Sequence, residues 1–507
     1  MIILWLLFLI VVLWIIQFRY KRRRIYELAS TFPSASGPIP LLGVAHRFIG
    51  NTESIMSSLR KISYECITQG GTIKGWFGPM LYFMVADPVN TETVLKSCLE
   101  KDDILRFVAN VLGYGIILAP VPIWKVRRKV MMPALTPKIV DSFFHIFVTQ
   151  ANELAENLEP FCGTGQFGVW PFINRYALQS ICETALGVKI KSQNDPNVPF
   201  LTALNKVLKL VSERIFQIWL QPDWLYKLFR SKYTEHEKCR RIIMDFLDEI
   251  ILNKRKDIDA NKTFEIKNDG NILENYKNQA FLDLLIYASG GDKGYNDVEL
   301  REEVLILIIA GADTSAASIS NTLLLMGKYP NIQEKVHEEL LSVFENSDRP
   351  LVKEDLPKLQ YLERVIKESL RLFPPGPVIV RKTVRETALP SGHILPAGSG
   401  VIISIFGAHR DPKYWGPDVE CFDPDRFLPE RYNLPYPCCY IPFSNGPRNC
   451  VGYQYAMMSM KGALSTILRR YKVIGTPEKG PIPHIKMKYD LTMKAVDDYQ
   501  IELLQRK

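Results

Sequence analysis

Hydrophobic residues are most concentrated in two parts of the 507-residue chain, at the N-terminus and in a segment after its middle. Residues 1–18 read MIILWLLFLIVVLWIIQF, and Gln17 is their only polar side chain. This length is near the lower limit for a helix that crosses a bilayer core of ~30 Å. Five basic residues follow within residues 19–24, which favours a cytosolic location for the rest of the chain. The pattern predicts a transmembrane signal-anchor over residues 1–18.

Two alternatives to this anchor are open. A cleaved secretory peptide would carry its basic residues before the apolar run, whereas here they follow it, and the run is long. A buried core helix is the other alternative, although the apolar surface continues all round the helix, as in a membrane span. Residues 31–43, TFPSASGPIPLLG, contain three prolines and two glycines and cannot form a regular helix. We therefore expect a basic flank and proline-rich hinge over residues 19–43, followed by one domain over residues 44–507.

The second hydrophobic segment predicts one long helix over residues 297–328. It contains no proline, Asn296 is a suitable N-cap, and three glutamates occupy its first turns. At 1.5 Å per residue the helix would span ~48 Å, enough to cross the domain. Residues 304–312 are apolar on every side, so we expect them to be buried.

The remaining pattern is mostly helical. Apolar periodicity predicts helices near residues 332–344, 357–372 and 451–471, whereas residues 378–405 show short apolar runs broken by proline and glycine, which are typical of strands. The expected fold class is mainly α with a minor β-sheet region.

Charge and cysteine content exclude two classes of protein. The net charge is +9, but the cluster at residues 19–24 supplies five of these charges and leaves about +4 for the rest, so a nucleic-acid partner is not indicated. Nine scattered cysteines in a chain of this size suit a reducing compartment better than a disulfide scaffold.

One cysteine has surroundings that indicate chemistry. Cys450 lies in the segment FSNGPRNCVG, just before a helical pattern, where free amide groups and the helix dipole stabilise a thiolate. Gly446 permits a tight turn, Gly452 lets the helix backbone approach a large flat group, and Arg448 supplies a cation for an acidic group. A small buried hydrophobic residue is the ordinary alternative for a lone cysteine. Zinc is another, but the nearby cysteines 438 and 439 are adjacent, and no local histidine completes four ligands.

The segment FSNGPRNCVG resembles the F-x-x-G-x-R-x-C-x-G signature of the cytochrome P-450 superfamily of haem-thiolate monooxygenases. Three further segments are similar to that family's motifs and occur in the family's order, and the resemblance covers the whole chain. They are Ala310-Gly-Ala-Asp-Thr-Ser, Glu368-Ser-Leu-Arg371 and Phe422-Asp-Pro-Asp-Arg-Phe427. The resemblance implies the cytochrome P-450 fold with an N-terminal transmembrane anchor. It also implies a haem b whose iron is bound by Cys450, with Phe443 in the cofactor site.

Haem carries two propionates, which need cations and hydrogen-bond donors. Trp124 and Arg128 are four residues apart and would share one side of a helix. They resemble the family's propionate clamp, and Arg381 and Arg448 resemble its further propionate ligands. A solvated arginine is the ordinary alternative for each of these positions.

Glu368 and Arg371 are three residues apart, so they can pair on one helix face. An exposed pair would contribute less than ~1 kcal/mol. The neighbouring apolar residues argue for burial, and the resemblance implies a buried ion network of these two residues with Arg426.

Catalysis is expected to centre on Asp313 and Thr314. A threonine inside a helix often donates a hydrogen bond to the carbonyl four residues earlier, which is the ordinary alternative. Gly311 would let the helix open locally and admit water. The resemblance implies that Thr314 hydrogen-bonds dioxygen or its water and that Asp313 helps to relay protons.

Within the superfamily, residues 112–135, 181–189 and 221–229 are similar to the fatty-acid ω-hydroxylase-related family 4 group. In that group position 310 is usually a glutamate, which can form an ester to a haem methyl, whereas here it is Ala310. We therefore expect the haem to be held only by the Cys450–iron bond, propionate contacts and apolar burial. The small side chain also predicts a roomier pocket and a weaker preference for chain-terminal oxidation.

The resemblance implies insertion of one oxygen atom from dioxygen into a small apolar substrate, such as a fatty acid, terpenoid, steroid or xenobiotic. Electrons would come from NADPH through NADPH–cytochrome P-450 reductase, with cytochrome b5 as an additional candidate partner. The enzyme would lie in the endoplasmic reticulum membrane with a cytosolic domain, and Lys125, Arg127 and Lys129 would contribute to a basic surface for the reductase. The alternative is a reductase-independent isomerase or apolar-ligand-sequestering protein. A requirement for NADPH and reductase discriminates between them, and Asp313 and Thr314 favour the monooxygenase.

Overall fold

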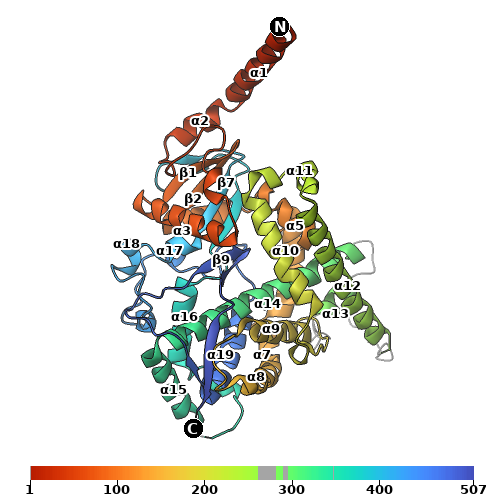
Figure 1. Ribbon diagram of the computed structural model, residues 1–507, viewed down its shortest axis with the longest axis vertical. Coiled ribbons are helices and arrows are strands. Elements are labelled where there is room, and N and C mark those ends of the chain that lie inside the picture. The colour runs from red at the N-terminus through yellow and green to blue at the C-terminus, as the bar shows by residue number, and fades with distance from the viewer. Residues whose placement is uncertain (1, 261–280, 289–294, 346, 507) are drawn as a thin grey trace.

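The long helix α14 (Asp297–Lys328) crosses the body of the molecule, as the hydrophobic pattern predicts (Figure 1). The computed structural model describes residues 2–260, 281–288, 295–345 and 347–506. The Asn296 side chain accepts a hydrogen bond from the Glu299 N–H, and the Glu299 carboxylate accepts one from the Asn296 N–H, which forms a capping box. Residues 304–308 are buried as expected, whereas residues 309–311 are only half-buried.

The other α-helices confirm the mainly helical class. In the first half of the described chain they are α1 (Ile2–Lys21), α2 (Arg23–Ser30), α3 (Thr52–Thr68), α4 (Pro88–Ser97), α5 (Arg106–Leu112), α6 (Val121–Met131), α7 (Pro137–Ser142), α8 (Phe144–Leu158), α9 (Trp170–Thr184), α10 (Pro199–Phe216), α11 (Asp223–Leu228) and α12 (Arg230–Ala260). In the second half they are α13 (Phe281–Ala288), α15 (Pro330–Phe344), α16 (Gln360–Leu372), α17 (Ile405–Ala408), α18 (Pro412–Trp415) and α19 (Tyr453–Arg470). The helices predicted near residues 332–344, 357–372 and 451–471 correspond to α15, α16 and α19.

The strands form small sheets, the largest of which has the order β1-β2-β7-β4. Its β2 and β7 are parallel and its other neighbours antiparallel. The strands are β1 (Thr72–Phe77), β2 (Met80–Val85), β3 (Phe167–Gly168), β4 (Val378–Lys382), β5 (Thr387–Ala388), β6 (Ile394–Leu395), β7 (Gly400–Ser404), β8 (Tyr471–Ile474), β9 (Met487–Asp490), β10 (Thr492–Ala495) and β11 (Gln500–Gln505). The strand-like pattern at residues 378–405 therefore corresponds to β4, β5, β6 and β7.

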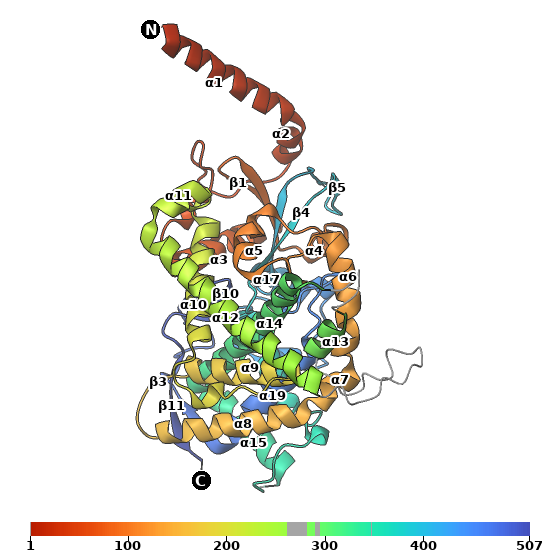
Figure 2. The same ribbon diagram turned by 90° about the vertical axis from the view of Figure 1, so that its right-hand side faces the viewer.

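Helix α1 projects away from the rest of the molecule in both views (Figures 1 and 2). Large apolar side chains on it, among them Trp5 and Trp14, are more than half exposed. The proline-rich segment after α2 is not a free linker, because the Lys74 N–H donates to the Pro33 carbonyl and the Val44 N–H donates to the Trp76 carbonyl. Part of this segment therefore packs along β1.

Among the described residues, α14 is the helix that is both long and apolar enough to span a membrane. However, 78% of its apolar window is buried inside the protein, as in a core helix. Its burial by the surrounding helices positions the middle of α14, and the side chains on it, inside the domain.

Candidate functional site

Cys450 lies in a loop that leads into α19 and is shaped to present its sulfur. The Gly452 N–H donates a hydrogen bond to the Cys450 Sγ at 3.3 Å, and the Cys450 N–H donates to the Phe443 carbonyl at 2.9 Å. Gly446 has φ +74°, and a Cβ there would lie 2.8 Å from the Leu95 carbonyl oxygen. The predicted tight turn therefore requires glycine for two independent reasons.

The thiol of Cys450 experiences opposing electrostatic effects. Desolvation raises its pKa, whereas the hydrogen bond from Gly452 and the charge of Arg128 lower it. Arg128 also fixes the loop, because its Nη1 donates to the Asn449 carbonyl at 2.9 Å and its Nη2 to the Asn449 Oδ1 at 2.6 Å. The loop thus presents an accessible sulfur beside a cation, and a bound metal ion would complete the deprotonation.

Trp124 and Arg448 lie together, as the predicted propionate site requires. The Arg448 guanidinium is 4.6 Å from the centroid of the buried Trp124 ring, and its Nη2 donates to the Ala119 carbonyl at 2.7 Å. Its Nε and Nη1 are buried and have no hydrogen-bond partner among the described residues. Arg381 is also buried, and its Nε bonds to none of those residues either. Burial lowers the pKa of Arg381 and of Arg448 to about 10. The charge of Arg448 lowers the pKa of Arg381 further, whereas Glu100 raises and Arg128 lowers the pKa of Arg448.

Lys101 is a member of this cation cluster that the sequence did not indicate. Burial lowers its pKa well below the usual range, and Arg381 and Arg448 lower it further. None of the three forms an ion pair with a carboxylate in the described parts of the chain. Arg381 and Arg448 are buried, and Glu100 acts on Arg448 only from beyond ion-pair distance, so an acidic ligand would stabilise the cluster. A flat cofactor with two carboxylates, bound through its metal to Cys450, fits these residues.

The structure separates the two predicted catalytic side chains on α14. Thr314 is half-buried, and its Oγ1 donates to the Ala310 carbonyl at 2.6 Å, which is the ordinary helical arrangement. Asp313 is buried and accepts hydrogen bonds of 2.5 Å from both Lys494 Nζ and Thr492 Oγ1 on β10. The carboxylate is therefore held by the β9–β10 hairpin, a contact that no sequence spacing indicated.

Gly311 has a different role from the one expected. Helix α14 is continuous across it. A Cβ at this position would lie 2.5 Å from Ile181 Cδ1 on α9. The absence of a side chain therefore allows α9 and α14 to pack closely, which accounts for the glycine without local opening of the helix.

The predicted ion network on α16 is confirmed. Glu368 and Arg371 are fully buried, and Arg371 Nε lies 2.6 Å from Glu368 Oε2. Arg426 is also buried, with its Nε 3.6 Å from Glu368 Oε1, and it pairs with Asp418 at 2.9 Å. The network connects α16 to the segment that precedes the Cys450 loop.

The predicted basic surface around α6 is wrong in one residue. Lys125 and Lys129 are exposed, but the Arg127 side chain is only 6% exposed. Arg127 contacts Glu303 on α14 at 3.0 Å, and Glu299 and Glu302 lie within 3.4 Å. The residues that neutralise Arg127 come from a helix more than 170 positions later, so the local sequence could not show them.

A family model described as Cytochrome P450 matches residues 33–501. The chain belongs to the cytochrome P450 family. Similar curated proteins are "Cytochrome P450 4V2" of Homo sapiens, 34% identical over 86% of this chain and 84% of that protein, and "Cytochrome P450 4c21" of Blattella germanica, 32% identical over 89% of each. "Cytochrome P450 4c3" of Drosophila melanogaster is 32% identical over 91% of this chain and 88% of that protein.

Membership of this family identifies the enzyme class as cytochrome P450 monooxygenase, with a haem cofactor. The relatives confirm the resemblance to family 4. The cytochrome P450 fold also agrees with the helical architecture and the minor sheets. The comparisons do not favour an isomerase or a sequestering protein. A redox partner, dioxygen and a substrate follow from the family.

Proposed function

We propose that this cytochrome P450 holds a haem b through Cys450 and oxidises a small apolar substrate such as a fatty acid, terpenoid, steroid or xenobiotic. The observation that carries the proposal is the combination of an exposed Cys450, whose sulfur accepts the Gly452 N–H, with two buried arginines whose nitrogens lack partners among the residues that the structure describes. Arg381 and Arg448, with Lys101, would bind the propionates. Phe443 and Trp124 would pack beside the cofactor, and Arg128 would hold the Cys450 loop. When bound, the haem supplies the iron at which dioxygen is activated, and a thiolate ligand favours O–O cleavage.

Thr314 and Asp313 would control proton delivery. The Thr314 hydroxyl, now donating to the Ala310 carbonyl, can rotate to hydrogen-bond dioxygen or a water molecule. Asp313 can pass a proton only if its carboxylate leaves Lys494, because both oxygens are engaged by the hairpin. Proton transfer thus depends on transient opening of this buried ion pair.

The haem would be held without a covalent link to the polypeptide apart from the Cys450–iron bond. Ala310 lies one helical turn before Thr314, on the same face of α14, and its methyl group cannot form an ester. Asp313, the nearest carboxylate along the helix, is already bound to β10.

The N-terminus and the electron donor form a second part of the proposal. Residues 1–18 within the projecting α1 would anchor the enzyme in the endoplasmic reticulum membrane, and residues 19–43 would connect the anchor to a cytosolic domain, residues 44–507. NADPH–cytochrome P450 reductase, with cytochrome b5 as an additional donor, would approach a surface that includes the exposed Lys125 and Lys129.

Reconstitution with isotopically labelled dioxygen tests the proposed reaction. The enzyme in lipid vesicles, with reductase and NADPH, should place one labelled oxygen atom in the product, and omission of either component should abolish product. Product formation without NADPH would contradict the proposal. Removal of residues 1–24 should leave a protein that folds and binds haem but sediments less with microsomes, whereas unchanged sedimentation would contradict the anchor.

A further inference from the structure

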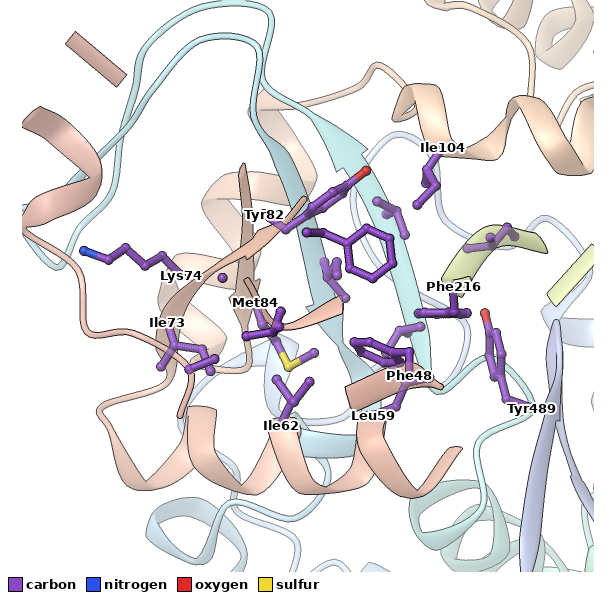
Figure 3. A pocket seen from close by; sticks show the side chains of 18 of the residues that line it. Phe48, Leu59, Ile62, Ile73, Lys74, Tyr82, Met84, Ile104, Phe216 and Tyr489 are labelled. Carbon is purple, nitrogen blue, oxygen red and sulfur yellow. The ribbon is translucent and has the colours of Figure 1, made fainter. Parts of the chain in front are cut away.

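An apolar cavity lies between the largest sheet, α3, the end of α10 and the β9–β10 hairpin (Figure 3). Its volume is about 100 Å³, and it is partly open to solvent. Val378 and Val380 of β4 line it, and Val380 directly precedes Arg381 of the cation cluster. The hairpin that closes it also holds Asp313. This cavity therefore adjoins the elements that carry the proposed site.

One wall of the cavity is a continuous row of aromatic rings. Tyr489 packs edge-on against Phe216 at 5.8 Å between centroids, and Phe216 stacks on Phe48 at 4.8 Å. The row continues to Phe77 at 5.9 Å and then to Tyr82 at 6.3 Å. Most of the other lining side chains are aliphatic. An elongated apolar molecule could contact rings along its whole length.

The two hydroxyl groups at the ends of this row have different surroundings. The Tyr82 hydroxyl donates to Asp102 Oδ1 at 2.9 Å, so its hydrogen bond is already made. The Tyr489 hydroxyl makes no hydrogen bond with any residue that the structure describes, although Tyr489 is only 7% exposed. Desolvation raises the pKa of Tyr489, so its phenol stays protonated and remains a donor.

The position of Tyr489 is fixed by its hairpin. Tyr489 pairs with Met493, whose N–H donates to the Pro375 carbonyl at 2.8 Å. At the tip of the hairpin, the Leu491 N–H donates to Ser212 Oγ on α10 at 2.7 Å. The phenol is therefore held against the cavity rather than carried on a free loop.

The Tyr489 Oη keeps accessible surface, so a small molecule can reach it. The edge-on contact with Phe216 needs only the ring. The hydroxyl is therefore available to a ligand in the cavity. Lys74, the cationic residue of the lining, donates to the Ala29 carbonyl at 2.6 Å and is directed away from the other labelled side chains (Figure 3).

We propose that Tyr489 donates a hydrogen bond to the substrate, and that the preferred substrates are elongated apolar molecules with one neutral oxygen, such as a fatty alcohol. A free carboxylate is a poorer ligand here, because it would lose its hydration in a cavity whose lysine is engaged elsewhere. This assignment of a specificity-determining residue rests on the proposed monooxygenase function and narrows its substrate class.

Calorimetric titration of the haem-loaded enzyme with decanol, decane and decanoate tests the assignment. Wild type should bind decanol more tightly than decane or decanoate. Tyr489→Phe should weaken decanol binding about three- to tenfold, as expected for one hydrogen bond, and leave decane binding unchanged. Tyr82→Phe is the matched control, because it removes a hydroxyl that is already bonded to Asp102. This variant should preserve the ratio of decanol to decane affinity.

Three results would overturn the assignment: equal weakening of both ligands in Tyr489→Phe, no preference for decanol in wild type, or tightest binding of decanoate. The spectrum of the reduced, carbon-monoxide-bound protein is recorded on every sample. A histidine-type spectrum would refute the proposed thiolate ligation. The ligand preference is measured by calorimetry, so its result is independent of the spectrum.

Discussion

Replacement of Arg371 by alanine tests how much the buried ion network contributes to stability. Arg371 has no exposed surface and makes two bonds to Glu368, at 2.6 and 2.8 Å. It also donates to three backbone carbonyls, those of His409 at 2.9 Å, Val419 at 2.7 Å and Cys421 at 3.1 Å. Its removal would leave a buried carboxylate that retains only the Asp423 N–H at 3.0 Å and Arg426 Nε at 3.6 Å.

The expected loss follows from this burial. Removing one partner of a buried ion pair costs about 3–5 kcal/mol, because the remaining charge is desolvated without compensation. With an unfolding entropy of about 2.1 cal/mol/K per residue over the whole chain, the Tm should fall by about 3–5 °C. The measurement is the thermal midpoint of the haem-loaded enzyme at one fixed scan rate, since unfolding of so large a protein is not expected to be reversible.

Lys96→Ala is the matched control. Lys96 Nζ lies 2.5 Å from Glu92, but the side chains are 62% and 31% exposed, so solvent screens the pair and the loss of Lys96 should leave the thermal midpoint almost unchanged. Arg371→Lys, which keeps the charge and loses the guanidinium bonds to the carbonyls, should fall between the two. Equal midpoints for Arg371→Ala and Lys96→Ala would refute the reasoning that burial, rather than distance, determines the contribution.

Three further predictions concern protons and cofactor retention. Thr314→Ala should retain haem but divert reducing equivalents into hydrogen peroxide, seen as a lower ratio of product to NADPH consumed; an unchanged ratio would count against the proton-delivery role. Burial raises the pKa of Glu303 to about 7 from its usual value of 4.5. The folded state therefore binds the Glu303 proton more tightly than the unfolded state does, and the free energy of unfolding falls as the pH rises from about 4.5 to 7. Glu303→Gln should remove that decline, of at most about 3 kcal/mol, and a decline of the same size in the variant would show that other groups cause it. Because residue 310 is alanine, acidified organic solvent should extract the haem, and co-migration of haem with the denatured chain on reversed-phase chromatography would reveal a covalent link.

Local sequence predicted the features whose partners are close along the chain. The cap of α14 needs only Asn296 and Glu299, and the α16 pair needs only Glu368 and Arg371, so helical spacing was sufficient. The turn before Cys450 was likewise visible from its glycine.

The features that sequence alone missed depend on partners from distant segments. Asp313 is bonded to a lysine 181 positions later, and Arg127 is neutralised by glutamates on α14. Lys101 joins its two arginines only through the packing of β4 and the Cys450 loop. The Tyr489 hydroxyl bonds to none of the residues that the structure describes, and no spacing rule predicts such an absence.

The axial ligand is the central claim, and the spectrum of the reduced, carbon-monoxide-bound enzyme tests it most directly. Freshly purified wild type should show the strongly red-shifted band of a thiolate-ligated haem, because Cys450 supplies the sulfur. Cys450→Ala should lose that band and all activity, whereas Cys439→Ala, which removes a buried cysteine outside the loop, should keep the band. A histidine-type spectrum in wild type, or a thiolate band that survives in Cys450→Ala, would contradict the account.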